Sequence, residues 1–108
     1  MKKGIFVVAS SGDYSNGVMM FSANVPNVIS VGALDENDEV LALTSGSNQT
    51  TLNSPGDNIT SLNDNCEIVY SSGTSQATVL VSGYISLLKY YEIQTKVVLS
   101  NKEVMQYR

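Results

Sequence analysis

Residues 71–78 combine hydroxyl side chains with a glycine, directly before an apolar stretch of helical length. The run reads Ser71-Ser72-Gly73-Thr74-Ser75-Gln76-Ala77-Thr78. Gly73 has no Cβ, so backbone or a ligand can approach closely there. Ser75 is expected at the first helical turn, where free backbone N–H groups and the helix dipole favour negative charge. The run therefore predicts a nucleophilic serine, although a Ser/Thr-rich N-cap on an ordinary core helix explains it equally well.

The chain contains no histidine that could activate Ser75. A serine hydroxyl is a weak nucleophile unless a neighbouring base accepts its proton. We therefore expect these 108 residues to carry half of an active site and not to catalyse a reaction alone.

The apolar runs and turn residues predict an α/β arrangement around this serine. Continuous apolar runs at 5–9 and 28–33 are typical of buried parallel strands, and we expect these two strands to be neighbours. Further short strands are predicted at 50–53, 58–61 and 68–70, and a charged turn at 35–38. The apolar helix is predicted from about residue 74 to 91, beginning at Ser75. Because it is apolar nearly all round, with Gly83 as a thin spot for close packing, we expect it to be buried in a large domain.

Four segments resemble, in the right order, motifs of the subtilisin-like serine proteases, the subtilase family. Residues 73–83 are similar to the family's nucleophile motif, G-T-S-x-A-[ST]-P-x-V-[AS]-G. Residues 4–13 resemble its strand and oxyanion-loop segment, residues 21–33 its Y-P-A-x-x-P-x-V-I-x-V-G-A segment, and residues 54–59 its A-P-G-x-x-I segment. The resemblance covers residues 4 to about 90. It implies an α/β fold, the C-terminal portion of the family's three-layer architecture with a parallel sheet.

The resemblance also implies roles for individual residues. Ser75 is the implied nucleophile of peptide-bond hydrolysis, which in the family is activated by a histidine that an aspartate orients. Asp13 stands where the family has its oxyanion-hole asparagine. Ser10, Ser11 and Gly12 match the wall on which backbone groups hold a substrate peptide as an added strand.

Three departures from the family pattern qualify these roles. Asp13 is a carboxylate in place of an amide donor, and losing one oxyanion donor costs about 2.7–4 kcal/mol. One branch of the kexin-like processing proteases also has aspartate here and is active, and a turn-forming aspartate fits the position as well. Val79 replaces the motif's proline. The segments that carry the family's catalytic aspartate and histidine lie N-terminal to the matching region.

The length allows one domain, and a subtilase catalytic domain is more than twice as long. We therefore expect residues 1–108 to form a partial subtilase catalytic domain. The ends agree with truncation, because a strand starts almost at once and a helix-capping pattern begins at residues 100–103.

The net charge is −4, and the acidic residues from 13 to 67 lie without an intervening base between Lys3 and Lys89. Such a chain lacks the basic footprint that nucleic acid requires. The acidic stretch is either a solvated surface or a rim that favours basic substrate residues. No apolar run is long enough to span a membrane. No signal peptide is visible, so we leave the localisation open, although the family is usually secreted or on the cell surface.

We predict no cofactor and no metal site; the resemblance implies at most a weak cation site of backbone carbonyls near residues 23, 25 and 28. The first functional hypothesis is a fragment of a serine endopeptidase that works only with a complementary N-terminal segment bearing the aspartate and histidine. The second is a non-catalytic pseudoprotease remnant that acts as a binding or assembly partner. The third is an unrelated small α/β domain. The expected partners are a peptide or protein substrate and either the complementary segment or a second copy of the chain.

Overall fold

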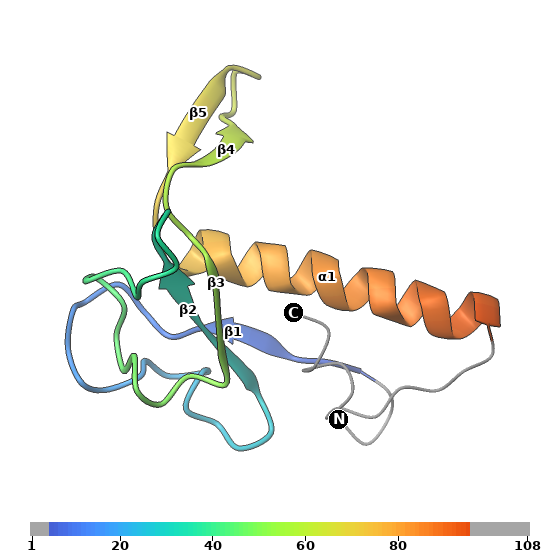
Figure 1. Ribbon diagram of the computed structural model, residues 1–108, viewed down its shortest axis with the longest axis horizontal. Helices are drawn as coiled ribbons and strands as arrows, with labels where there is room; N and C mark the ends of the chain where they lie inside the picture. The colour runs from blue at the N-terminus through green and yellow to red at the C-terminus, as the bar shows by residue number, and fades with distance from the viewer. Residues whose placement is uncertain (1–4, 96–108) are drawn as a thin grey trace.

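The computed structural model describes residues 5–95, so the predicted capping pattern at 100–103 lies outside the described residues. This part of the chain contains five strands and one helix (Figure 1). They are β1 (Val8–Ser10), β2 (Ile29–Leu34), β3 (Leu52–Pro55), β4 (Ile59–Leu62), β5 (Ile68–Ser71) and α1 (Thr74–Thr95).

Three strands form a parallel sheet in the order β1-β2-β3. Val8 lies opposite Ile29, and Val31 lies opposite Leu52. The predicted pairing of the first two apolar runs is therefore confirmed, although β1 is shorter than the run that predicts it and β3 begins two residues later than expected. Because β2 is the middle strand, it carries the most deeply buried residues.

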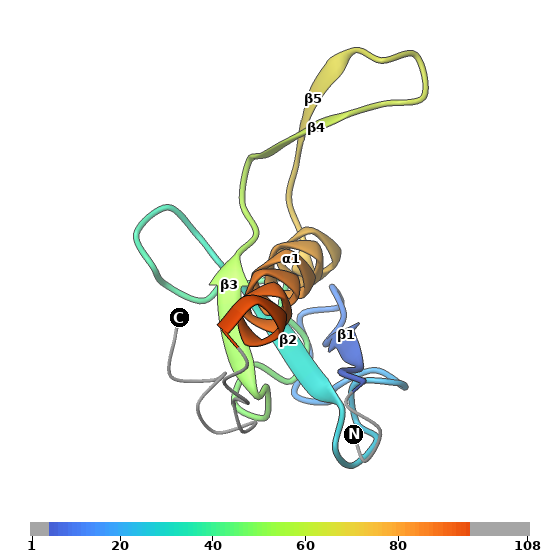
Figure 2. The same ribbon diagram turned by 90° about the vertical axis from the view of Figure 1, so that its right-hand side faces the viewer.

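The core lies between one face of this sheet and α1, which packs against all three strands and is seen nearly end-on in front of the sheet in Figure 2. Side chains of one face of β2 meet one face of the helix, as the period of two along a strand requires. The buried cluster consists of Ile29, Val31, Ala33, Leu52, Ala77, Val81 and Ile85.

The structure corrects two expectations about the helix. It begins at Thr74, one residue before Ser75, and it continues to Thr95. It is also buried on one face only, because the sheet is the only layer that covers it within residues 5–95. Its other sides expose large apolar side chains, of which Leu87 and Ile93 are 71% and 73% exposed. The described residues thus supply a sheet and one helical layer of the expected three layers.

Strands β4 and β5 form a separate antiparallel hairpin that projects away from the sheet and leads directly into α1 (Figures 1 and 2). Leu62 pairs with Ile68, and Thr60 pairs with Tyr70. These opposed pairs share one face of the hairpin, and Leu62, Ile68 and Tyr70 are all exposed.

Within residues 5–95, the structure contains no helix that qualifies as a membrane span.

Candidate active site

Ser75 lies in the first turn of α1, exposed to solvent, immediately after the hairpin returns to the sheet. Gly73 occupies the N-cap position, since its carbonyl accepts the hydrogen bond of the Ala77 N–H at 3.3 Å. Within residues 5–95, the hydroxyl of Ser75 and the backbone N–H groups of Ser75 and Gln76 make no hydrogen bond. A hydroxyl and two free N–H groups therefore meet at the positive end of the helix dipole.

The remaining N–H at this helix end is bound by Asp13. One carboxylate oxygen of Asp13, Oδ1, accepts hydrogen bonds from the Thr74 backbone N–H and from the Thr74 hydroxyl, each at 2.8 Å. The Thr74 hydroxyl in turn accepts a hydrogen bond from the Gly12 N–H at 3.2 Å. The loop after β1 is thus tied to the first turn of α1 through Thr74, the residue directly before Ser75.

Two hollows meet at Ser75, one on each side. The first, about 330 Å³, lies between strand β4 and α1, and the second, about 520 Å³, lies between the β1 edge and α1. The first is lined by Ile59, Thr60, Ser61, Ser75, Gln76, Val79 and Leu80. The second is lined by Val7, Val8, Ala9, Ser10, Phe21, Ser22, Ser75 and Thr78. An extended chain passing over Ser75 would therefore have room on both sides.

The three residues predicted to form the substrate wall, Ser10, Ser11 and Gly12, differ in their position relative to Ser75. Ser10 is half-buried and lines the same hollow as Ser75. Ser11 is fully buried, and its hydroxyl has no hydrogen-bond partner among the described residues. Gly12 turns the chain toward α1 through its bond to Thr74. Ser10 and Gly12 thus lie near the nucleophile candidate, whereas the side chain of Ser11 faces the interior.

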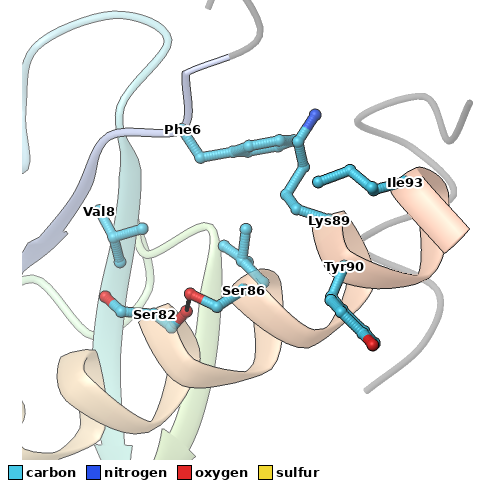
Figure 3. Close-up of a pocket in the computed structure, with 8 residues that line it drawn as sticks. Phe6, Val8, Ser82, Ser86, Lys89, Tyr90 and Ile93 are labelled. Atoms are coloured by element: carbon cyan, nitrogen blue, oxygen red, sulfur yellow. Dashed lines mark hydrogen bonds between the residues drawn. The ribbon is translucent and has the colours of Figure 1, made fainter.

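A third hollow, which we call the β1–α1 groove, continues along the open edge of β1 away from Ser75. It measures about 430 Å³ and is lined by Phe6, Val8, Ser82, Ile85, Ser86, Lys89, Tyr90 and Ile93 (Figure 3). Lys89 lies over the Phe6 ring, 5.6 Å from its centroid, and pairs with Glu92 at 3.0 Å. Val8 lines both this groove and the hollow beside Ser75, so the two hollows adjoin at β1.

The residue that sequence reasoning missed is Thr74. Thr74 is fully buried, and its hydroxyl makes two and its backbone N–H one of the hydrogen bonds that join the loop to the helix. The sequence shows Thr74 directly before Ser75, but its hydrogen-bond partners Gly12 and Asp13 lie about sixty residues earlier, so no local sequence pattern predicts these bonds. No group of three or more His, Cys, Asp or Glu side chains among residues 5–95 is arranged to hold a metal ion.

The sequence matches the model of the family described as "Subtilase family" over residues 1–107. It is 33% identical over 89 residues to "Minor extracellular protease Epr" of Bacillus subtilis (strain 168), which covers 82% of this chain and 14% of that protein. It is 31% identical over 87 residues to "Subtilisin Savinase" of Lederbergia lenta, which covers 81% of this chain and 32% of that protein.

Solved protease structures share the fold. The "Prenylagaramide maturation protease PagA" matches with a TM-score of 0.82 and 26% identity, over 88% of this chain and 35% of that chain. The "self-cleaved protease domain of PatA" matches equally well, over 37% of its chain. The chain therefore spans 37% or less of the length of each of these four relatives.

Proposed function

The chain belongs to the subtilase family of serine proteases, and we propose that it carries the nucleophile of a peptidase active site that another segment completes. The observation that carries this proposal is the exposed Ser75 hydroxyl, which lies beside free N–H groups in the first turn of α1. The family resemblance of residues 73–83 points to the same residue.

In the proposed reaction, Ser75 Oγ attacks the carbonyl carbon of a peptide bond, and its proton passes to a base on the other segment. The carbonyl oxygen becomes an oxyanion, which the Ser75 N–H would stabilise; that this N–H has no partner among residues 5–95 supports the assignment. Collapse of the tetrahedral intermediate breaks the C–N bond, and the amine leaves with the proton. Water then hydrolyses the acyl-enzyme and restores the Ser75 hydroxyl.

The hollows beside Ser75 support a peptide as the substrate. A peptide held across an active site needs room on both sides of the bond that breaks, and Ser75 lies where two hollows meet. Ser10 lines the hollow on the β1 side, where an extended peptide could add to the sheet edge.

The base must come from outside these residues, because the chain has no histidine. The β1–α1 groove is the surface we propose for the complementary segment. There β1 is the edge strand of the sheet that residues 5–95 form, and α1 exposes apolar side chains such as Tyr90 and Ile93. A strand added to β1 and a helix laid along α1 would cover both, whether they belong to the same polypeptide or to another.

A chimera tests the proposal. In it, the part of this chain that matches Subtilisin Savinase over 87 residues replaces the corresponding region of that protease, and hydrolysis of a mixture of fluorogenic peptides is measured. We expect hydrolysis that is lost in Ser75→Ala. The matched control is Ser47→Ala, which removes an exposed serine hydroxyl that makes no hydrogen bond among the described residues and should leave hydrolysis within about threefold of the parent.

A chimera that is folded and monomeric but does not hydrolyse peptides would contradict the proposal, as would hydrolysis that survives Ser75→Ala. The first outcome would favour the second candidate function, a non-catalytic binding or assembly partner. Two observations favour this second candidate function: the chain has no histidine, and the carboxylate of Asp13 lies at the helix end.

A further inference from the structure

We propose that Asp13 is a positioning residue, which caps α1 from a distance through Thr74 and so ties the substrate-side loop to the nucleophile. The inference rests on the proposed function only in taking Ser75 as the group that is positioned. The capping contact itself is a property of the fold.

The helix needs an external cap because its N-cap residue is Gly73, which has no side chain. The first N–H groups of a helix lack internal partners, and an N-cap oxygen usually satisfies one of them. Here the oxygen comes from Asp13, 61 positions before Thr74, and it accepts both the backbone N–H and the hydroxyl of Thr74. The negative charge also lies at the favourable end of the helix dipole.

Gly73 also provides the space that this contact requires. A Cβ built on Gly73 would lie 3.0 Å from Asp13 Oδ2 and 2.8 Å from Gln76 Oε1, and the residue has φ of 154°. A larger residue would therefore push against the carboxylate. The Asp13 carboxylate can therefore approach the helix end because the N-cap residue is a glycine.

The loop is fixed by the same contact. The Gly12 N–H donates to the Thr74 hydroxyl, so Thr74 joins two successive residues of the loop, Gly12 and Asp13, to the helix. Ser10, which shares a hollow with Ser75, lies two residues earlier in the same segment. Asp13 thereby sets the distance between the β1 side of the site and Ser75.

Amide hydrogen exchange of the full 108-residue chain tests this role without any catalysis. In Asp13→Ala we expect the Thr74 and Gly12 amides to exchange at least tenfold faster than in the parent. The Val31 amide in the middle of the sheet should be unchanged, which separates a local effect from global unfolding. The matched control is Asp64→Ala, which removes an exposed carboxylate from the hairpin turn and should change neither amide.

Conservative variants separate the hydrogen bonds from the charge. Asp13→Asn keeps an acceptor oxygen for Thr74, and Thr74→Ser keeps the hydroxyl, so both should exchange within threefold of the parent. Thr74→Val should resemble Asp13→Ala at the Gly12 amide. Parent-like exchange in Asp13→Ala, or Asp13→Asn behaving like Asp13→Ala, would overturn the proposal, as would an equal increase at Val31.

The outcome is independent of the proposed reaction. If the exchange pattern holds and the Savinase chimera leaves peptides intact, the cap stands and the peptidase proposal fails. If peptides are hydrolysed and the exchange pattern fails, Asp13 is not the cap and the peptidase proposal stands.

Discussion

The Ser75 hydroxyl makes no hydrogen bond among the described residues because the carboxylate that reaches this helix end binds Thr74, the residue before it, and leaves the N–H groups of Ser75 and Gln76 free. Gly73 has no side chain, and Asp13 binds Thr74 instead of Ser75. The local sequence was sufficient to predict that Ser75 lies in the first turn of the helix. It could not predict the bond between Asp13 and Thr74, because no local periodicity relates residues so far apart in the chain.

At this scale, Asp13→Asn is expected to raise kcat in the Savinase chimera. The asparagine oxygen can keep both bonds to Thr74, while its amide nitrogen would put a donor in the place of Oδ2, which lies beside Gly73, two residues before Ser75. The gain is bounded by the value of one oxyanion donor, about 2.7–4 kcal/mol. Peptide hydrolysis at saturating substrate measures it, with Asp64→Asn as the control for loss of charge. A kcat equal to or below that of the parent would show that residue 13 does not face the oxyanion.

The elements were predictable where a long apolar pattern defines them. The buried strand β2 and the helix α1 follow from their own residues, and the parallel pairing of β1 with β2 follows from the α/β class. The degree of burial was not predictable, because apolar residues such as Leu87 indicate that a surface is to be covered but not what covers it. The apolar residues of β1 likewise predict a buried strand, but β1 lies at the edge of the sheet formed by residues 5–95 and is only partly buried there.

Substitution of Gly56 and of Gly83, which differ in their surroundings, tests how the elements pack. A Cβ on Gly56 would lie 2.7 Å from both the Ala33 Cβ and the Gly73 carbonyl oxygen, whereas a Cβ on Gly83 would meet nothing within 4 Å. We expect Gly56→Ala to lower the free energy of unfolding by about 1–3 kcal/mol, because neither neighbour can move easily. Gly83→Ala should raise it by about 0.5–1 kcal/mol, as in other helix interiors. Urea denaturation measures both, and changes of the same sign would contradict the packing described.

The molecule as a whole exposes an apolar surface that its own residues 5–95 do not cover. Large apolar side chains of α1 and the hairpin are exposed, and the β1 edge is unpaired within the described sheet. Surfaces of this kind mark interaction sites or promote association. The family assignment agrees, because the solved proteases that share the fold are more than twice as long as this chain.

We therefore expect the isolated chain to self-associate, with a weight-average mass in sedimentation velocity that rises with concentration. Ile93→Lys, which places a charge in the β1–α1 groove, should shift association to higher concentration. Leu62→Lys, which changes an exposed leucine on the hairpin, should have less effect. A monomer at every concentration would count against an uncovered interface, and a larger effect of Leu62→Lys would assign the association to the hairpin.

The most direct measurement is the site of covalent labelling by a serine-directed fluorophosphonate, mapped by peptide mass spectrometry. In the Savinase chimera we predict a single adduct on Ser75, since the complementary segment then supplies the base. In the isolated 108-residue chain we predict no adduct, because it has no histidine. An adduct on another serine of this chain, or none in a folded chimera, would contradict Ser75 as the nucleophile; an adduct on the isolated chain would contradict the need for a second segment.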